Sequence, residues 1–226
     1  MIEIRNLKKT FKDGENTTEV LKGIDFVAES GEFVAIMGRS GAGKSTFLYQ
    51  MSLLDEPTEG EIFIDKRNMG SLTINEKTYF RLSELGYVFQ DYALLPEMDA
   101  LENVALPLLM QDMSEKKAYE EATEALIKVG LGKRLRNLPG QLSGGEQQRV
   151  SIARAIAHEP RILFADEPTA NLDNESSRII MDIFKELHEA GQTIIMVTHE
   201  TEYSKFAGRI IHLDDGRVVK ELLVEK

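Results

Sequence analysis

The chain has 226 residues, of which 42% are hydrophobic and 29% charged, and this is the composition of an ordinary globular protein. Its formal net charge of −11 disfavours broad nucleic-acid binding and direct adhesion to anionic lipid. There is no cysteine, no apolar run of the roughly 18 residues that a membrane span needs, and no apolar N-terminal stretch typical of a signal peptide. We therefore expect a cytoplasmic chain without disulfides, held at a membrane, if at all, by a protein partner.

The first 30 residues are expected to form an antiparallel hairpin or meander. Apolar residues alternate with polar ones, as at Ile2 and Ile4, and a polar turn falls at residues 12–16. Phe11 stands just before this turn. Taken alone it is more typical of a core residue. The glycine-rich sequence GRSGAGKST at residues 38–46, which has the spacing of a nucleotide-binding loop, makes Phe11 instead a platform on which adenine stacks.

A phosphate-binding loop follows the apolar run FVAIM at residues 33–37, which has the length of a buried strand. The spacing G-x-x-x-x-G-K-[ST] requires glycines so that successive N–H groups converge on phosphate oxygens. The lysine reaches the β and γ phosphates, the serine hydroxyl is a Mg²⁺ ligand, and the following helix adds its positive end. A strand before and a helix after argue against a fortuitous glycine turn. The predicted phosphate site comprises Gly38, Arg39, Ser40, Gly41, Ala42, Gly43, Lys44, Ser45 and Thr46.

Residues 91–158 are expected to form a helical block inserted between two strand runs. The strand run before it, residues 85–89, ends at Gln90, which is either a solvated loop residue or a sensor of the γ phosphate or its metal ion. Within the block, Ser114 is expected to cap a helix that stops at Gly130.

The sequence LSGGEQQR at residues 142–149 opens a further helix. Ser143, Gly144 and Gly145 form either an ordinary helix cap or a second anion site, because a helix N-terminus offers free N–H groups and a positive dipole end. Taken alone, the helix cap is the better interpretation.

Two carboxylates follow the apolar strand at residues 162–165. Downstream of a phosphate loop, Asp166 is placed to hold Mg²⁺ through water, and Glu167 to orient or deprotonate the attacking water. The alternative is an exposed acidic strand end. His199 ends the later strand at residues 193–197; alone it is more often structural, but we expect it at the same sheet edge.

The rest of the chain alternates helix and strand, which predicts an α/β fold with a mainly parallel sheet and one domain over residues 1–226. Residues 175–190 are expected to be a helix whose inward-facing residues are Ile179, Ile180, Ile183, Phe184 and Leu187. Residues 209–224 are expected to form a hairpin about Asp214-Asp215-Gly216.

The ordered set of motifs resembles the ATP-binding cassette family over essentially the whole chain. The set is Phe11, GRSGAGKST at 38–46, Gln90, LSGGE at 142–146, ILFADE at 162–167, ANLD at 170–173 and His199. The resemblance implies a P-loop NTPase core with an antiparallel β subdomain and an inserted helical subdomain. It also implies that two such chains, or this chain and a homologue, sandwich two ATP molecules head to tail.

The resemblance further implies a role for each motif residue. Ser143, Gly144 and Gly145 would contact the γ phosphate held by the other subunit's Lys44 and Ser45, and Asp173 would lie across the dimer interface. Glu167 would be the general base, and His199 would contact the γ phosphate. Mg²⁺ would be surrounded by Ser45, Gln90 and Asp166.

Within the family, three segments resemble the lipoprotein-releasing, macrolide-exporting and cell-division ATPases: residues 53–62, 90–108 and 166–173. Members of this group work with a separate membrane subunit. We expect that subunit to dock near Asp91–Leu108, where apolar residues alternate with Glu97, Asp99 and Glu102 and so suit a basic or amphipathic helix.

This chain departs from the family pattern at three positions. Phe11 replaces the usual tyrosine, Glu146 replaces glutamine, and Arg39 stands where proline is common. None of the three changes removes a catalytic group.

The function expected from this resemblance is that of an ATPase subunit of a membrane transporter. An alternative is a cell-division type of ATPase that signals through its membrane partner without transport. A soluble DNA-repair or translation ATPase is disfavoured by the acidic charge balance, the single cassette and the lack of coiled-coil or zinc insertions. The substrate and the direction of transport belong to the membrane subunit.

Overall fold

The computed structural model describes residues 1–14 and 16–224. The chain divides into a first unit, Met1–Tyr79 with Gly191–Lys226, and a second unit, Phe80–Ala190. Glu15, in the predicted turn at residues 12–16, lies outside the described residues.

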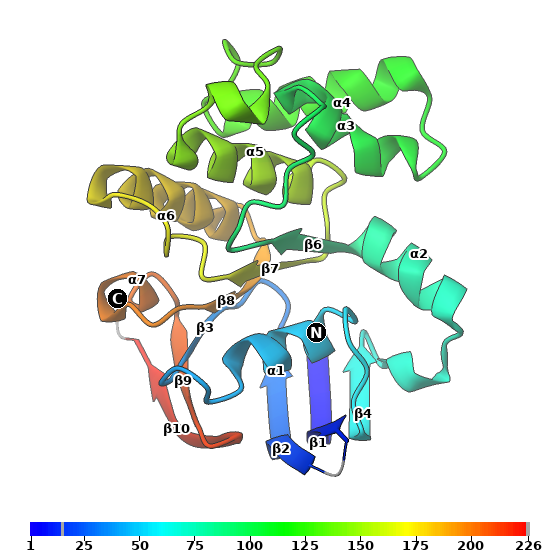
Figure 1. Ribbon diagram of the computed structural model, residues 1–226, viewed down its shortest axis with the longest axis vertical. Helices are drawn as coiled ribbons and strands as arrows, with labels where there is room; N and C mark the ends of the chain where they lie inside the picture. Colours follow the sequence, from blue (N-terminus) through cyan, green and yellow to red (C-terminus); the bar gives the residue numbers. More distant parts are fainter. Residues whose placement is uncertain (15, 225–226) are drawn as a thin grey trace. The chain divides into compact units, whose positions relative to one another are not determined.

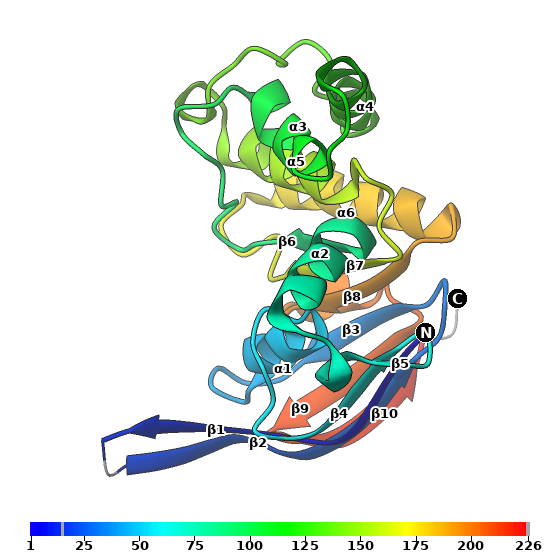
Figure 2. The same cartoon turned by 90° about the vertical axis from the view of Figure 1, so that its right-hand side faces the viewer.

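The first unit contains an antiparallel sheet with the strand order β2-β1-β4-β5. The strands are β1 (Ile2–Asp13), β2 (Asn16–Ala28), β4 (Glu59–Ile64) and β5 (Arg67–Asn68), and a 3-10 turn, η1 (Met69–Ser71), follows them. Alternation buries one face of β1, and the predicted hairpin is confirmed by the pairing of β1 with β2. In Figure 2 this hairpin extends beyond β4.

A second group of strands in the first unit has the order β10-β9-β3-β8. These strands are β3 (Phe33–Met37), β8 (Thr193–Val197), β9 (Arg209–Asp214) and β10 (Arg217–Leu223). β3 runs parallel to β8 and β9, whereas β10 pairs antiparallel with β9 as the predicted hairpin. Every residue of β3 and β8 is buried, as expected for central parallel strands.

Helix α1 (Lys44–Met51) packs within the first unit against β2 and β8 (Figure 1). Phe47 is fully buried and meets the ring of Phe26 edge to face, with 5.6 Å between centroids. A short helix, α7 (Thr201–Ser204), follows β8. Helix α2 (Ile74–Glu84) leads from the first unit to the second, and none of its residues is buried.

The second unit combines the parallel strands β6 (Leu85–Val88) and β7 (Ile162–Asp166) with four helices. The helices are α3 (Ala100–Leu109), α4 (Glu115–Lys128), α5 (Gly144–Ile156) and α6 (Asn174–Glu189), and η2 (Pro139–Gln141) is a short 3-10 turn. Helix α5 contacts α3, α4, α6 and β6, so it is the central element of this unit.

Two helix predictions need correction. Ser114 occupies the N-cap position of α4, and Gly130 follows its end in a left-handed conformation (φ 77°), but the Ser114 side chain makes no capping hydrogen bond. On α6, Ile180 and Phe184 are buried as expected, whereas Ile179 is 41% exposed. Adjacent isoleucines project about 100° apart on a helix, so only one of the pair can face the core.

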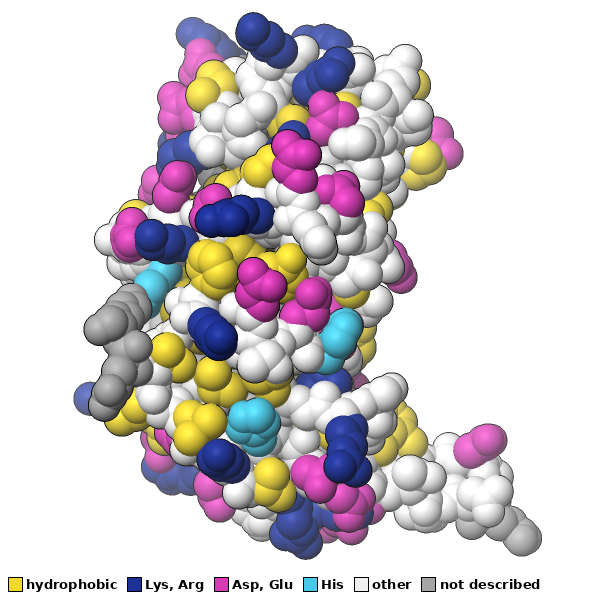
Figure 3. All heavy atoms as spheres, turned by 90° about the vertical axis from the view of Figure 1, so that its left-hand side faces the viewer, with side chains coloured by type: hydrophobic (Ala, Val, Ile, Leu, Met, Phe, Trp, Pro, Cys, Tyr) yellow, Lys and Arg dark blue, Asp and Glu magenta, His cyan; other side chains and the backbone are white. Residues whose placement is uncertain are grey.

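Acidic and basic side chains are mixed on the surface of the protein. On the face shown in Figure 3, acidic and basic side chains of the described residues are interspersed and do not gather into one basic patch. Several form surface ion pairs, such as Lys8 with Glu59 at 2.7 Å and Arg134 with Glu146 at 3.0 Å. Mixed pairing of this kind is expected when charged residues make up 29% of the chain.

Candidate nucleotide-binding site

The predicted phosphate loop joins β3 to α1 in the first unit. A Cβ atom on Gly38 would lie 2.2 Å from the carbonyl oxygen of Leu213, so only glycine allows this close approach. Gly41 has a left-handed backbone (φ 79°), and a Cβ there would meet nothing within 4 Å. The loop therefore turns its backbone toward open space, as a cradle for a ligand requires.

The N-terminus of α1 is suited to an anion. Its N-cap, Gly43, makes no side-chain capping bond, and the first turn carries no acidic residue. Lys44 is only 7% exposed, and its ammonium donates a hydrogen bond of 3.1 Å to the carbonyl oxygen of Arg39. A triphosphate would replace this neutral acceptor with charged ones, so the residues present fit a bound nucleotide.

His199 lies at the same sheet edge as the phosphate loop. Strands β3 and β8 are parallel neighbours in which Ile36 pairs with Val197, and the Thr198 amide donates to the Ile36 carbonyl at 3.1 Å. His199 is exposed just beyond this pairing. Within the first unit, the phosphate loop and His199 therefore follow the carboxyl ends of neighbouring parallel strands.

Phe11, near the end of β1, is not a core residue. Its side chain is 47% exposed. The ammonium of Lys9 lies over the ring, 5.0 Å from its centroid. The core alternative for this aromatic is therefore wrong, because nearly half of its surface is accessible.

In the second unit, Gln90 and Asp166 follow neighbouring parallel strands. Strand β6 pairs with β7 so that Val88 faces Ala165. Asp166 is the last residue of β7 and is 5% exposed. Gln90 is exposed and lies two residues beyond the end of β6. Glu167 comes next with φ 44°, a left-handed conformation that is uncommon for a residue with a side chain. Such strained positions cluster at functional sites.

The LSGGE sequence forms the capped start of α5. The Ser143 hydroxyl accepts the Glu146 N–H at 3.2 Å, and the Glu146 carboxylate accepts the Ser143 N–H at 2.8 Å. Glu146 also binds Arg134 at 3.0 Å. The Ser143 backbone hydrogen bond, followed by the nearby Ser143 hydroxyl and Arg134, lowers the pKa of Glu146. The helix-cap interpretation is confirmed, and a capping hydroxyl still keeps its own proton to donate to an anion.

Both glycines of this motif lie against neighbouring segments. A Cβ on Gly145 would lie 2.7 Å from Oγ of Ser176 on α6, and one on Gly144 would lie 2.9 Å from the hydroxyl of Tyr92. An added Cβ would therefore force the Tyr92 or Ser176 side chain to move, which favours glycine at these positions.

Sequence reasoning missed two α5 residues that hold the site segments. Gln148 is fully buried, and its amide donates to the carbonyl of Pro168 at 2.9 Å and to that of Phe89 at 3.4 Å. The Arg154 guanidinium donates to the Tyr92 carbonyl at 2.9 Å and also to that of the next residue. The sequence could have indicated these residues, because each is a polar residue on the helix face that otherwise carries apolar residues.

Asp173 is the N-cap of α6. Its carboxylate accepts the Ser176 N–H at 2.8 Å and the Ser176 hydroxyl at 2.9 Å, and the backbone bond is the main cause of its lowered pKa. This residue therefore has a structural role within its own chain.

An expected feature of the docking stretch is corrected. Asp99 is 8% exposed; it caps α3, and its second oxygen accepts Arg136 at 3.1 Å. The Glu102 carboxylate accepts the Asp99 N–H at 2.8 Å. The carboxylates of Asp99 and Glu102 thus accept hydrogen bonds from groups of this chain, so they do not favour a basic partner.

A groove of about 230 Å³ lies in the second unit between the end of α2, β6 and α3. We call it the α2–α3 groove. Its lining includes no acidic residue; the residues are Arg81, Leu82, Leu85, Gly86, Tyr87, Leu106, Pro107, Met110, Arg154, Ala155 and His158. Burial is the main cause of a lowered pKa at His158. The groove is thus mainly apolar, and its basic side chains are those of Arg81 and Arg154.

Metal ligands are sparse in residues 1–14 and 16–224, where no three His, Asp or Glu side chains gather as a metal site. Over the same residues, no helix has the length and apolar character needed to cross a bilayer.

A family model described as "ABC transporter" matches residues 21–170. The chain belongs to the ABC transporter family. The cassette is 49% identical to the ABC transporter ATP-binding protein MJ1508 of Methanocaldococcus jannaschii, covering 97% of this chain and 98% of that one. It is 46% identical to the lipoprotein-releasing system ATP-binding protein LolD of Aquifex aeolicus, covering 98% and 97%.

Two further comparisons extend this identification. The cassette is 44% identical to the macrolide export ATP-binding/permease protein MacB of Bdellovibrio bacteriovorus, covering 96% of this chain but 33% of that longer protein. A solved dimeric structure of the cassette MJ0796, bound to ADP and Pi, superposes with a TM-score of 0.93 at 42% identity over the whole of both chains. The predicted family, α/β fold and ATPase activity are thereby confirmed.

Proposed function

We propose that the cassette binds ATP at residues 38–46 and hydrolyses it to drive a separate membrane subunit, as one nucleotide-binding domain. The observation that carries this proposal is the N-terminus of α1, which has no side-chain cap and no acidic residue in its first turn. Lys44 lies beside it, and its ammonium donates a hydrogen bond to the carbonyl oxygen of Arg39. This arrangement suits the β and γ phosphates better than any neutral ligand.

Catalysis is proposed to require a second cassette, either another copy or a homologue. The dimeric ADP- and Pi-bound relative supports this, since its fold matches over the whole chain. In such a dimer, Ser143, Gly144 and Gly145 would reach the γ phosphate held by the other subunit, and Asp173 would lie near the interface. The cap at Ser143 preorganises these donors before ATP arrives.

Within each site, Glu167 is proposed as the general base and His199 as a γ-phosphate contact. Ser45, Gln90 and Asp166 are the proposed Mg²⁺ ligands; the ion, when bound, neutralises charge on the β and γ phosphate oxygens. The aromatic Phe11 stacks on adenine. The left-handed backbone of Glu167 supports its assignment, because such strain is retained where function requires it.

The Glu167→Gln variant tests the catalytic assignment. It should keep ATP affinity, lose most turnover, and accumulate an ATP-bound dimer in size-exclusion chromatography, because glutamine cannot accept the proton of the attacking water. Glu189→Gln, an exposed change on α6, is the control and should behave as the parent. Parental turnover by the Glu167 variant would show that another residue is the base.

The membrane subunit is proposed to dock at the Asp91–Leu108 stretch, by placing an amphipathic helix in the adjoining α2–α3 groove. The relatives named for lipoprotein release and macrolide export support a membrane partner, which would hold the cassette at the cytoplasmic face. The apolar lining and the basic residues without acidic ones favour a helix that carries an acidic side chain.

Co-purification tests this docking. Met110→Glu, with Met110 62% exposed at the groove, should reduce recovery of the native membrane subunit while ATP affinity is unchanged. Ile127→Glu, at a residue 58% exposed on α4, is the matched control. Recovery that survives substitutions throughout the groove would place the docking surface elsewhere.

A further inference from the structure

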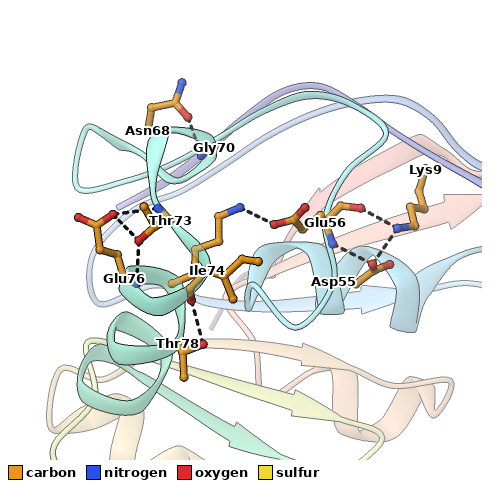
Figure 4. A network of polar contacts seen from close by, with 10 residues as sticks. Lys9, Asp55, Glu56, Asn68, Gly70, Thr73, Ile74, Glu76 and Thr78 are labelled. Atoms are coloured by element: carbon orange, nitrogen blue, oxygen red, sulfur yellow. Dashed lines mark hydrogen bonds and ion pairs between the residues drawn. The ribbon is translucent and has the colours of Figure 1, made fainter.

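Lys9 connects the exposed ring of Phe11 to the loop that follows α1. Its ammonium binds Oδ1 of Asp55 at 2.7 Å and the carbonyl oxygen of Glu56 at 2.6 Å, as Figure 4 shows. The Lys9 side chain is only 12% exposed. The same ammonium lies 5.0 Å from the centroid of the Phe11 ring. A cation held by two acceptors is therefore fixed over one face of this ring.

Phe11 remains partly exposed beside this cation. The β1–β2 register is irregular between Lys9 and Thr10, so strand alternation alone does not predict this contact, and the Lys9 ammonium reaches the Phe11 ring across the irregularity. Phe11 is 47% exposed, and a half-exposed aromatic ring without a fixed neighbour would sample several rotamers. The cation–π contact restricts the ring before any base arrives.

The contacts continue from Asp55 into the phosphate-loop helix. The second carboxylate oxygen of Asp55 accepts the side-chain amide of Gln50 at 2.8 Å. Gln50 is fully buried on α1, the helix that begins at the phosphate loop. Lys9 and Asp55 therefore connect the element that holds phosphates to the ring that would hold the base.

We propose that Lys9 is a positioning residue, which holds the Phe11 ring in the orientation that adenine stacking requires. This inference rests on the proposed function, because it assumes a nucleotide whose phosphates occupy residues 38–46. Lys9 acts through Phe11 and Asp55 and does not itself touch the nucleotide. Its loss should weaken recognition of the base and leave recognition of the phosphates intact.

Calorimetric titration of Lys9→Met with Mg·ATP and with inorganic tripolyphosphate separates these two effects. ATP affinity should fall about twofold to tenfold, the cost of ordering one more side chain on binding, while tripolyphosphate affinity is unchanged. Lys9→Arg, which keeps the cation, should restore part of the loss.

Lys77→Met is the matched control. Lys77 binds Glu56 at 2.6 Å in the same network and is 16% exposed, close to the 12% of Lys9, but the structure gives it no contact with Phe11. This variant should bind both ligands as the parent does. An equal loss of ATP affinity in Lys77→Met would show that the network acts through the fold and would overturn the proposal.

A Phe11→Leu background decides whether Lys9 acts through the ring. There, Lys9→Met should lower ATP affinity no further, because the ring that it positions is already absent. An undiminished further loss, or an equal loss for tripolyphosphate, would overturn the positioning role. If Phe11→Leu binds ATP as tightly as the parent, the positioning role of Lys9 is also overturned, because the ring then contributes nothing to binding. The proposed ATP site at residues 38–46 would remain, since it is refuted only if the parent protein does not bind ATP.

Discussion

Replacing Glu146 should weaken the start of α5 to a degree that depends on the substitute. Its carboxylate accepts the Ser143 N–H at 2.8 Å and pairs with Arg134 at 3.0 Å. Alanine removes the reciprocal cap, at about 1 kcal/mol, and the half-exposed ion pair, at about 0.5 kcal/mol. Glutamine keeps an acceptor for the cap and loses only the charge, so Glu146→Gln should cost about 0.5 kcal/mol.

The stability cost of Glu146→Gln should become smaller as the pH falls. Folding lowers the pKa of Glu146 from its ordinary value of 4.5, chiefly through the backbone hydrogen bond of Ser143. The unfolded chain therefore takes up this proton first as the pH falls. The stabilisation by the carboxylate is complete above the ordinary value and is lost as the pH falls through the lower, folded-state value. The parent should then approach the stability of Glu146→Gln in acid.

Urea unfolding followed by circular dichroism, at neutral pH and in the acid range, measures this difference. Hydrogen exchange of residues 143–156 then localises it to α5. Glu124→Gln, an exposed change on α4, is the control and should alter neither quantity. A capping role for Glu146 is refuted if Glu146→Ala unfolds at the same urea concentration as the parent at neutral pH. It is also refuted if the stability difference between the parent and Glu146→Gln is as large in acid as at neutral pH.

Thermal melts test three further changes, with about 1 kcal/mol corresponding to 2–4 °C for a chain of this size. Asn103→Ala should cost about 2–3 kcal/mol, because this fully buried amide binds three carbonyls and one N–H of the preceding segment; an unchanged melt would contradict this. Gly86→Ala should cost about 1–3 kcal/mol, because its Cβ would lie 2.3 Å from the Ala155 carbonyl oxygen, whereas Gly140→Ala has nothing within 4 Å and should be neutral. Arg154→Lys loses the paired hydrogen bonds of the guanidinium to two backbone carbonyls and should cost about 1–2 kcal/mol. A melting temperature equal to that of the parent would show that these hydrogen bonds do not stabilise the fold.

Local patterns predicted the elements and the phosphate loop correctly. The spacing of residues 38–46, the buried run before it and the strand ends at Asp166 and His199 are short-range features, because strand and helix periodicities act over a few residues. The order of the motifs then identified the family, because several short motifs rarely occur in one fixed order by chance.

Contacts between distant segments required the tertiary structure. Asp99 was interpreted as a surface charge for a partner, yet it binds Arg136, which is 37 residues away. Lys9 and Asp55 are 46 residues apart, and no pattern on β1 alone predicts their ion pair. The side-chain period on a strand or helix determines which residues share a face, but the packing of other elements determines which charge or ring meets that face.

By itself, the sequence determined that this chain has a phosphate loop, an α/β fold and the residues of an ATPase. Only the tertiary structure decided that Gly145 lies against Ser176 of α6 and that the Lys9 ammonium lies over the Phe11 ring. Residue type and local spacing determine chemistry that operates within a single turn or strand. Burial and the pairing of remote charges depend on how the whole chain packs.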